Sequence, residues 1–322
     1  MFLRKLVACC LTLTFAALAP LAHAAWPERP IHFVMTAPAG SSIDTLGRVI
    51  ADKLKDSLGQ PVIVENKPAA GGTVATADVA HAAPDGYTMV LAYPGPLSAT
   101  PFMRTVPYDV QQDLAAVIIT SNQPNVLAVN ASLPVKTFQE LVAYVKARPG
   151  KLNYASVGNG SSSNLGMELL KSMTGMDIVH VPFNGSPPAV TATVQNETQM
   201  LFAVMQPLKP QIDAGKLRAL AVTTPKRFPL LPELPAIAES GVPGFEVNAW
   251  NGVLVPAGTP REIIDRLNRE INAVLKLPDV AQKLNAQGFE LVGGTPEEFD
   301  KLIRDDSARW APVIKKLGLK VD

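Results

Sequence analysis

The sequence predicts an α/β fold with two lobes, mixed or mainly parallel sheets, and helices on both faces of each sheet. Short apolar runs that indicate strands alternate along the chain with amphipathic runs that indicate helices. This alternation is typical of βαβ units. The 322 residues exceed what one hydrophobic core usually organises, so two lobes are expected.

The first third of the chain repeats a strand-then-helix unit. A strand is predicted over 31–36, and apolar residues then recur at helical spacing over 43–58 until Gly59 ends the run. The next strand is predicted over 62–65, and an alanine-rich helix after Gly71-Gly72 extends to Ala82. The turn 84–86 precedes a third strand over 87–92.

The rest of the chain continues in the same style. Capping boxes are predicted where Thr137 precedes Glu140, Thr259 precedes Glu262, and Thr295 precedes Glu298. A helix is also predicted over 165–173. The proline-dense segment 225–243 is expected to run over the surface. Further strands are predicted over 152–155, 178–181, 198–202, 217–223 and 250–255.

Residues 1–24 have the pattern of a secretory signal peptide. Arg4 and Lys5 precede an apolar run over 6–21, and the sequence Ala-His-Ala at 22–24 fits a cleavage site. A retained membrane anchor is the alternative, although the apolar run is short for a span. We therefore expect a mature chain that begins at Ala25 and works in the periplasm.

Composition excludes several classes of function. Cys9 and Cys10 are the only cysteines, so cleavage would leave no disulfide, thiol nucleophile or cysteine metal site. Loss of Arg4 and Lys5 would leave 27 of the 29 basic residues against 28 acidic ones, a formal charge of −1. Such a chain has no field to attract nucleic acid. The histidines are scattered, and we predict neither a metal nor a cofactor.

Two small-residue loops indicate a binding site for an anion. The segments 37–44 and 156–164 each follow a predicted strand and open a predicted helix. A helix start offers unpaired N–H groups and partial positive charge, so an acid could be held between two such loops. Gly158-Asn159-Gly160 could instead be only a tight turn. It is not a dinucleotide fingerprint, because Ser163 replaces the third glycine.

A series of motifs resembles the Bug (TctC-like) receptors of tripartite tricarboxylate transporters. The residues that carry the resemblance span nearly the whole mature chain in order: Val64-Glu65-Asn66-Lys67-Pro68 with Gly71-Gly72, then Ala83-Pro84-Asp85-Gly86-Tyr87, Leu152-Asn153-Tyr154-Ala155-Ser156, the run 214–221 and Pro256-Ala257-Gly258-Thr259-Pro260. The resemblance implies a periplasmic binding protein fold of type II, in which two lobes close on a small organic acid. We expect lobe 1 to comprise 25–122 and 251–322, and lobe 2 to comprise 123–250. The chain would leave lobe 1 near 121–124 and return near 250–255.

The resemblance also implies the ligand-binding residues. The first loop would contribute Pro38, Ala39, Gly40, Ser41 and Ser42, with Asp44 capping the helix or fixing the loop. The second loop would contribute Ser156, Gly158, Asn159, Gly160, Ser161, Ser162 and Asn164. Tyr93 and Pro94 would lie at a third strand exit, and Phe183, Asn184 and Gly185 would precede another helix. Met205 would line the wall. Asn164 and the run 203–205 depart from the common family pattern, so the ligand cannot be inherited from other members.

The expected mechanism is closure of the two lobes on a carboxylate by neutral donors. Neither loop contains an arginine, which favours a mono- or dicarboxylate of modest size, an amino acid or an aromatic acid. Ser156 is expected to donate to the acid, and Gly160 to leave space for it. We expect a monomer that delivers the acid to membrane permease subunits or, alternatively, reports it to a sensor kinase.

A secreted serine hydrolase is the rival class, with Ser156, His180 and Asp177 as a triad. Tyr154 stands where the first glycine of the nucleophile elbow would be. We therefore predict a binding protein that is not an enzyme.

Overall fold

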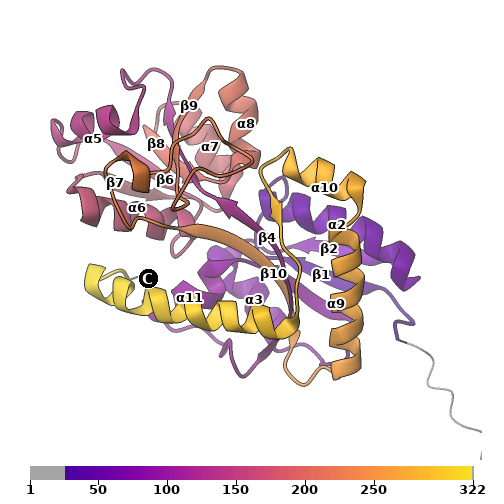
Figure 1. Ribbon diagram of the computed structural model, residues 1–322. Coiled ribbons are helices and arrows are strands. Elements are labelled where there is room, and N and C mark those ends of the chain that lie inside the picture. The colour runs from indigo at the N-terminus through magenta and orange to yellow at the C-terminus, as the bar shows by residue number, and fades with distance from the viewer. Residues whose placement is uncertain (1–25, 321–322) are drawn as a thin grey trace, which may run out of the picture.

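Two β-sheets, one in each lobe, organise the chain in the computed structural model, which describes residues 26–320 (Figure 1). We call the unit around the six-stranded sheet lobe 1 and the unit around the five-stranded sheet lobe 2. The strand orders are β11-β4-β10-β3-β1-β2 and β7-β6-β8-β5-β9. The predicted signal peptide, 1–24, lies outside the described residues.

Lobe 1 is a mixed sheet between two helical layers. β1 pairs in parallel with β2 and β3, whereas β10 pairs antiparallel with β3 and β4. One face packs against α2, α9 and α10, and the other against α3, η3 and α11. The elements are β1 (Ile31–Met35), α2 (Ser42–Leu58), β2 (Val62–Asn66), η2 (Ala69–Gly72), α3 (Thr73–Ala80), β3 (Thr88–Ala92), η3 (Gly95–Ala99), α4 (Thr100–Met103), β4 (Leu114–Pro124), β10 (Asn248–Pro256), α9 (Arg261–Leu275), α10 (Pro278–Asn285), β11 (Glu290–Leu291) and α11 (Pro296–Leu317).

Lobe 2 has the same layered plan. β6 pairs in parallel with β7 and β8, and β5 pairs antiparallel with β8 and β9. Helices α5 and α6 cover one face, while α7, α8 and the proline-dense segment cover the other. The elements are β5 (Val126–Asn130), α5 (Phe138–Lys146), β6 (Asn153–Ser156), α6 (Ser162–Thr174), β7 (Val179–Pro182), α7 (Ser186–Val194), β8 (Met200–Ala203), α8 (Met205–Asp213), β9 (Leu217–Val222) and η4 (Ala238–Ser240).

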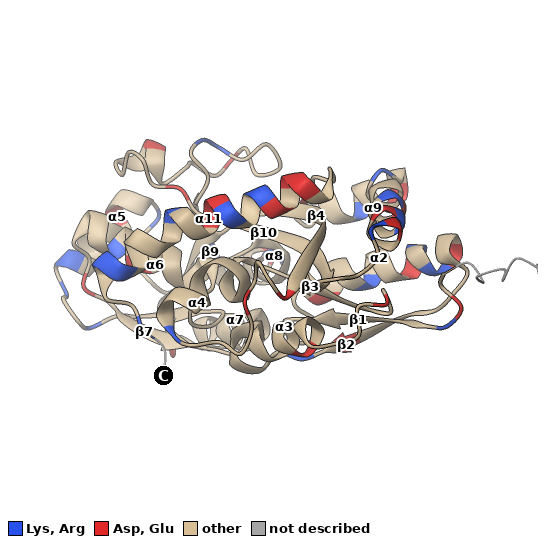
Figure 2. Cartoon of the chain, turned by 90° about the horizontal axis from the view of Figure 1, so that it is seen from below, with Lys and Arg blue, Asp and Glu red and all other residues tan. Residues whose placement is uncertain are grey.

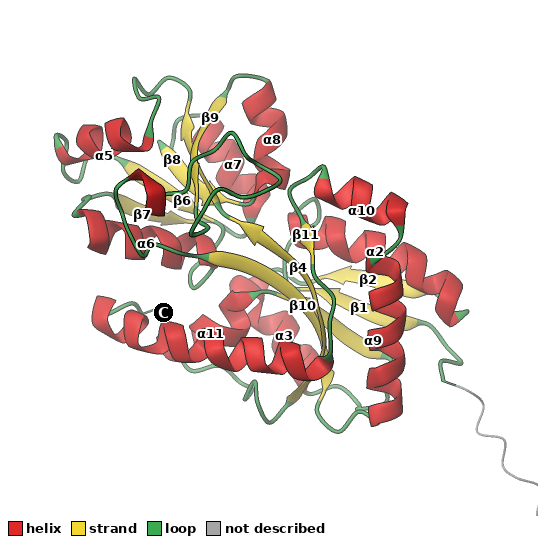
Figure 3. Ribbon diagram, in the orientation of Figure 1, coloured by secondary structure: helices red, strands yellow, loops and turns green. Residues whose placement is uncertain are grey.

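Two long strands connect the lobes (Figure 3). β4 and β10 run side by side, with Asn248 opposite Pro124 at the end that meets lobe 2. β5 begins at Val126, directly after β4, and already belongs to the other sheet. The sequence predicted β10 but neither β4 nor β5, because the polar run 120–123 interrupts the apolar pattern of β4.

Most predicted helix starts are confirmed, with one exception. Thr137 and Thr295 form reciprocal capping boxes with Glu140 and Glu298. The box predicted at Thr259 does not form, because its hydroxyl donates to Pro256 O at 2.7 Å and closes a turn instead. Helix α9 therefore starts after Pro260, without a side-chain cap.

The C-terminal helix α11 crosses from one lobe to the other. Its first half, including Phe299 and Ile303, packs in the core of lobe 1. Its last turns place Trp310 and Ile314 in the core of lobe 2, together with Ala99 and Met103 from lobe 1. The lobes therefore share a packed contact on this side.

Charged residues are spread over the outer helices without gathering by sign. Figure 2 shows acidic and basic residues interleaved along α9 and α11, where Asp300 pairs with Arg304 and Lys301 with Asp305. Within residues 26–320, no helix has both the length and the apolarity to cross a membrane.

Candidate ligand-binding site

The two predicted loops have the same local construction. In each loop a serine caps the helix by accepting from the N–H three residues ahead: Asp44 N donates to Ser41 Oγ at 3.3 Å, and Asn164 N to Ser161 Oγ at 3.2 Å. The glycine before each cap has a left-handed backbone, with φ of 78° at Gly40 and 73° at Gly160. This conformation is cheap only for glycine, and it turns the chain into the helix.

The same loops leave backbone donors free at the helix starts. Gly40 N donates to Asp44 Oδ2 at 3.0 Å, and Gly160 N to Asn164 Oδ1 at 3.1 Å. The first two N–H groups of each helix belong to residues 42 and 43 in α2 and to residues 162 and 163 in α6. Within the described chain, no protein group accepts a hydrogen bond from them. Such N–H groups at a positive helix end suit an anion.

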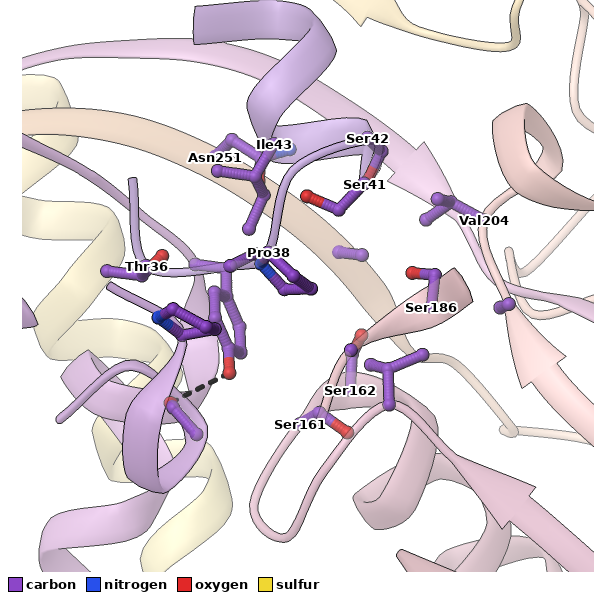
Figure 4. Close-up of a pocket in the computed structure, with 18 of the residues that line it drawn as sticks. Thr36, Pro38, Ser41, Ser42, Ile43, Ser161, Ser162, Ser186, Val204 and Asn251 are labelled. Atoms are coloured by element: carbon purple, nitrogen blue, oxygen red, sulfur yellow. Dashed lines mark hydrogen bonds between the residues drawn. The ribbon is translucent and has the colours of Figure 1, made fainter. Parts of the chain in front are cut away.

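A narrow cavity lies between these helix starts (Figure 4). The cavity volume open to water is about 70 Å³. Pro38, Ser41 and Ser42 face it from lobe 1, and Ser161, Ser162 and Ser186 from lobe 2. The start of α7 at Ser186 is thus a third helix N-terminus at the cavity. Among the described residues that line it, none carries a charged side chain.

The floor of the cavity consists of amide side chains from the connecting strands β4 and β10 and from the residue between β4 and β5. Gln123, Asn125 and Asn251 line it, and each is at most 4% exposed. Within the described chain, both polar atoms of the Gln123 amide and the Asn125 Nδ2 have no hydrogen-bond partner. A buried polar group without a partner is costly to the fold. Sequence analysis missed all three residues, although amides in otherwise apolar strands are a usable signal.

Tyr93 closes one wall of the cavity. Its hydroxyl donates to Gly71 O at 2.8 Å, the bond drawn as a dashed line in Figure 4. Burial raises the pKa of the Tyr93 hydroxyl well above its usual value of 10.0, so the group stays neutral. The ring therefore adds an apolar surface without a charge.

The structure brings nine of the predicted binding residues to this cavity. They are Pro38, Ser41, Ser42, Tyr93, Ser161, Ser162, Phe183, Asn184 and Gly185. Ala39, Gly40, Asp44, Pro94, Ser156, Asn164, Gly160 and Met205 do not line it. Gly158 and Asn159 line a neighbouring cavity. Val204, rather than Met205, faces the ligand cavity from the start of α8.

Ser156 supports its loop from behind the cavity. It is fully buried, its Oγ lies 2.7 Å from His180 Nε2, and it accepts from Gly158 N at 3.2 Å. In this structure Ser156 does not line the cavity, and its donation to the acid stays a prediction. Gly160 faces α4 of lobe 1, since a Cβ built on it would lie 2.7 Å from Thr100 Oγ1. The absence of a side chain at Gly160 thus leaves room for α4 of lobe 1.

His180 and its neighbours form a buried polar network under the second loop. Tyr154 stacks on the His180 ring at 4.7 Å and accepts from Asn164 Nδ2 at 3.0 Å. Burial lowers the pKa of His180 from 6.5 to about 4, so the ring is neutral at neutral pH. The Tyr154 hydroxyl donates to Glu168 at 2.6 Å, and burial raises its pKa.

Comparison with known protein families agrees with this architecture. Residues 46–319 match the model of the tripartite tricarboxylate transporter family receptor. The chain belongs to this family. It is 37% identical to the protein BugT of Bordetella pertussis over 305 residues, which cover 94% of each chain.

Solved structures of relatives agree closely with the fold. A protein from R. palustris solved with adipate has 37% identity and a TM-score of 0.88, over 92% of this chain and 99% of that one. MatC from Rhodopseudomonas palustris, with bound malate, has 31% identity and a TM-score of 0.85, over 90% and 100%. The two-lobed binding-protein fold is thereby confirmed.

Family membership identifies the protein as a solute-binding receptor and not an enzyme. The hydrolase alternative also lacks its geometry: Ser156 is fully buried, and His180 Nδ1 lies 3.5 Å from the Asn164 amide. Within residues 26–320, the hydrogen-bond partners of the His180 ring are Ser156 and Asn164, and neither is a carboxylate. The family consists of periplasmic receptors of tripartite transporters.

Proposed function

We propose that this receptor captures a small carboxylate between the starts of α2, α6 and α7. The observation that carries the proposal is a cavity with no charged wall residue, where three helix N-termini and buried, unpartnered amides converge. Fixed N–H dipoles in such a place favour an anion without a neutralising cation. Ser41, Ser42, Ser162 and Ser186 add hydroxyl donors, whereas the Ser161 hydroxyl donates to Gly158 O.

The neutral donors around the cavity favour an acid of modest charge and size, of about four to six carbons. Adipate and malate, which relatives hold in their structures, are acids in this range. Tyr93, Phe183 and Val204 give the cavity an apolar wall that suits a short carbon chain.

Capture would occur by closure of the lobes about β4 and β10. We propose that lobe 1, which comprises residues 25–122 and 251–322, moves as a body against lobe 2, residues 123–250. The last turns of α11 are the exception, because they stay with lobe 2. The structure has the lobes in contact, since a Cβ built on Gly185 would lie 2.6 Å from the Pro38 ring. The floor amides on the connecting strands would couple the ligand to the hinge.

We further propose that the receptor is a monomer exported through the 1–24 signal peptide and that it delivers its acid to membrane permease subunits. Deleting the permease genes should abolish growth on the acid while binding by the purified receptor persists. If an induced transcriptional response to the acid survives that deletion and requires the receptor, the receptor reports to a sensor instead.

Native mass spectrometry and titration calorimetry test the proposal. The purified receptor should release a small carboxylate on denaturation, and the same acid should bind the stripped protein. Small-angle scattering should show contraction when that acid is added. Binding without contraction contradicts closure. If the purified receptor releases no carboxylate and binds none from a panel of carboxylates, the proposed function is contradicted.

A further inference from the structure

The tip of the second loop, Asn159 and Gly160, lies against two segments of lobe 1. A Cβ built on Gly160 would lie 2.7 Å from Thr100 Oγ1 and 3.3 Å from Met103 Sδ, and both of these residues belong to α4. A Cβ built on Gly71, in η2, would lie 3.4 Å from Asn159 O. The tip therefore touches η2 on one side and α4 on the other. We call the recess between η2 and α4 the socket.

The η2 wall of the socket has an unusual backbone. Ala70, Gly71 and Gly72 are left-handed in succession, with φ of 52°, 63° and 83°. This conformation is unfavourable for alanine, and it persists only where neighbouring groups stabilise it. The Tyr93 hydroxyl donates to Gly71 O at 2.8 Å, and the Thr73 hydroxyl donates to Ala70 O at 2.9 Å. The shape of this wall thus depends on hydrogen bonds to its carbonyl oxygens.

Arg104 joins the two walls of the socket. It directly follows α4, and its Nη2 donates to Ala70 O at 3.2 Å and to Thr73 Oγ1 at 2.8 Å. A guanidinium is planar and presents its donors in a fixed geometry, so these bonds set the position of η2 relative to α4. Arg104 does not line the ligand cavity. Its hydrogen bonds therefore shape the surface that receives the tip, and they lie outside the wall that faces the acid.

We propose that the socket is a latch for the closed receptor and that Arg104 is its positioning residue. This inference rests on the proposed function, in which the lobes close on a carboxylate. The loop that carries the tip also opens α6, so docking of the tip and enclosure of the acid occur together. The contact forms only after the acid has entered. A well-formed socket therefore slows release of the acid and leaves its entry unaffected.

Stopped-flow kinetics of R104Q test the latch. The probes are adipate, malate and any acid that copurifies with the receptor. R104Q loses the charged donor to η2, so the dissociation rate constant should rise about tenfold, while the association rate constant stays within about twofold of wild type. The factor should be the same for every acid, because Arg104 acts through the socket. A residue that contacts the acid would instead change the preference among acids.

Three further variants separate the latch from charge and from folding. T73V removes the hydroxyl between Arg104 and Ala70 without changing any charge, and it should raise the dissociation rate constant by a smaller factor than R104Q. R104K keeps a charged donor and should restore part of the wild-type rate. R148Q is the matched control, because Arg148 also donates to a backbone carbonyl, Tyr144 O at 3.2 Å, on an exposed part of lobe 2. It should release acid at the wild-type rate. Melting temperatures check that each variant is folded.

Spin labels measure the latch independently of ligand kinetics. The only cysteines, Cys9 and Cys10, lie in the predicted signal peptide, so I63C with M173C gives the mature chain one label on each lobe. Both positions are exposed. Pulsed electron paramagnetic resonance should find a larger fraction of long interlobe distances in R104Q than in the wild type. This difference is expected both without acid and at half-saturation of the wild type.

The outcomes distinguish the latch from the proposed function. An unchanged dissociation rate constant in folded R104Q overturns the latch and leaves carboxylate capture intact. So does an increase that differs by more than about threefold between the acids that bind, because it would assign Arg104 to the ligand. If no carboxylate binds the wild type, the proposed function is contradicted, and the label distances without acid decide on the latch. Equal distance distributions in R104Q and wild type then overturn it.

Discussion

The loops that open α2 and α6 are built alike but handle charge differently. Both have a left-handed glycine, a capping serine and a second serine, and in both a side chain three residues past the cap accepts from the glycine N–H. In lobe 1 that side chain is Asp44, and in lobe 2 it is Asn164. The same shape is therefore reached with an anion in one lobe and a neutral amide in the other.

The surroundings explain the difference. One turn after Asp44 lies Arg48, whose Nε donates to Asp44 Oδ1 at 2.9 Å. One turn after Asn164 lies Glu168, which already accepts from Tyr154 and Lys171. A carboxylate is thus compensated in lobe 1 and would be repelled in lobe 2. Neither acceptor leaves an uncompensated negative charge at its helix start, which is compatible with the proposed binding of an anion there.

Removing the acceptor of lobe 1 should have the largest effect. D44A deletes bonds to Gly40 N, Asn66 and Arg48 at a buried position, and it should cost about 2 to 4 kcal/mol in the free energy of unfolding. Burial opposes ionisation of Asp44, but the bonds from Arg48, Gly40 and Asn66 outweigh it and lower the pKa below 3.8. The stability that ionised Asp44 contributes to the folded protein is therefore present above pH 3.8, and it is lost as the pH falls through the folded pKa of Asp44.

Denaturant titrations of D44A and wild type from pH 7 to 3 check this expectation. D44N serves as the matched control, because it keeps an acceptor for Gly40 N but loses the charge. A gap between D44A and wild type that stays constant down to pH 3 would contradict the role of the charge.

Moving the lobe 1 charge into lobe 2 should have the next largest effect. N164D puts a carboxylate one turn from Glu168 and should destabilise by about 1 to 2 kcal/mol at pH 7. Repulsion and burial should raise the pKa of the introduced carboxyl, so the deficit shrinks as the pH is lowered. Thermal melts at pH 7 and pH 5 measure the difference, and a variant as stable as wild type at pH 7 would show that the loops are interchangeable.

Replacing each of the two glycines by alanine should distinguish the effect of backbone strain in the loop from the effect of contact between the lobes. G40A and G160A both strain a left-handed residue and should each lose about 1 kcal/mol of stability. A Cβ at Gly40 meets nothing within 4 Å, whereas one at Gly160 lies 2.7 Å from Thr100 Oγ1 and 3.3 Å from Met103 Sδ. Only G160A should lower ligand affinity, by about fivefold, because it crowds the closed interface. Equal affinities in the two variants would argue against that contact.

The expected effect that is smallest at pH 7 concerns the buried polar network that only lobe 2 has. Because the folded pKa of His180 is depressed to about 4, its neutral form contributes stability that is present above pH 6.5 and is lost as the pH falls toward 4. H180Q should flatten the dependence of melting temperature on pH in this window. The same slope in both proteins would assign acid sensitivity to other groups.

The sequence predicted the loops well because their construction is local. Serine caps and small residues mark 41–42 and 161–162 directly, and both pairs line the cavity. Positions that depend on distant partners were not predictable in the same way. Ser156 contacts His180 and Gly160 faces α4, contacts that no local pattern encodes. Gln123 and Asn125, which line the cavity, were missed because β4 was not recognised as a strand.

A crystal structure of the receptor with its tightest-binding carboxylate tests the central claim most directly. We predict that one carboxylate accepts, at about 2.7 to 3.2 Å, from backbone N–H groups at the starts of both α2 and α6, and that no charged side chain contacts it. A carboxylate held by one lobe alone, or by a cationic side chain in place of these N–H groups, would contradict capture between two neutral helix starts.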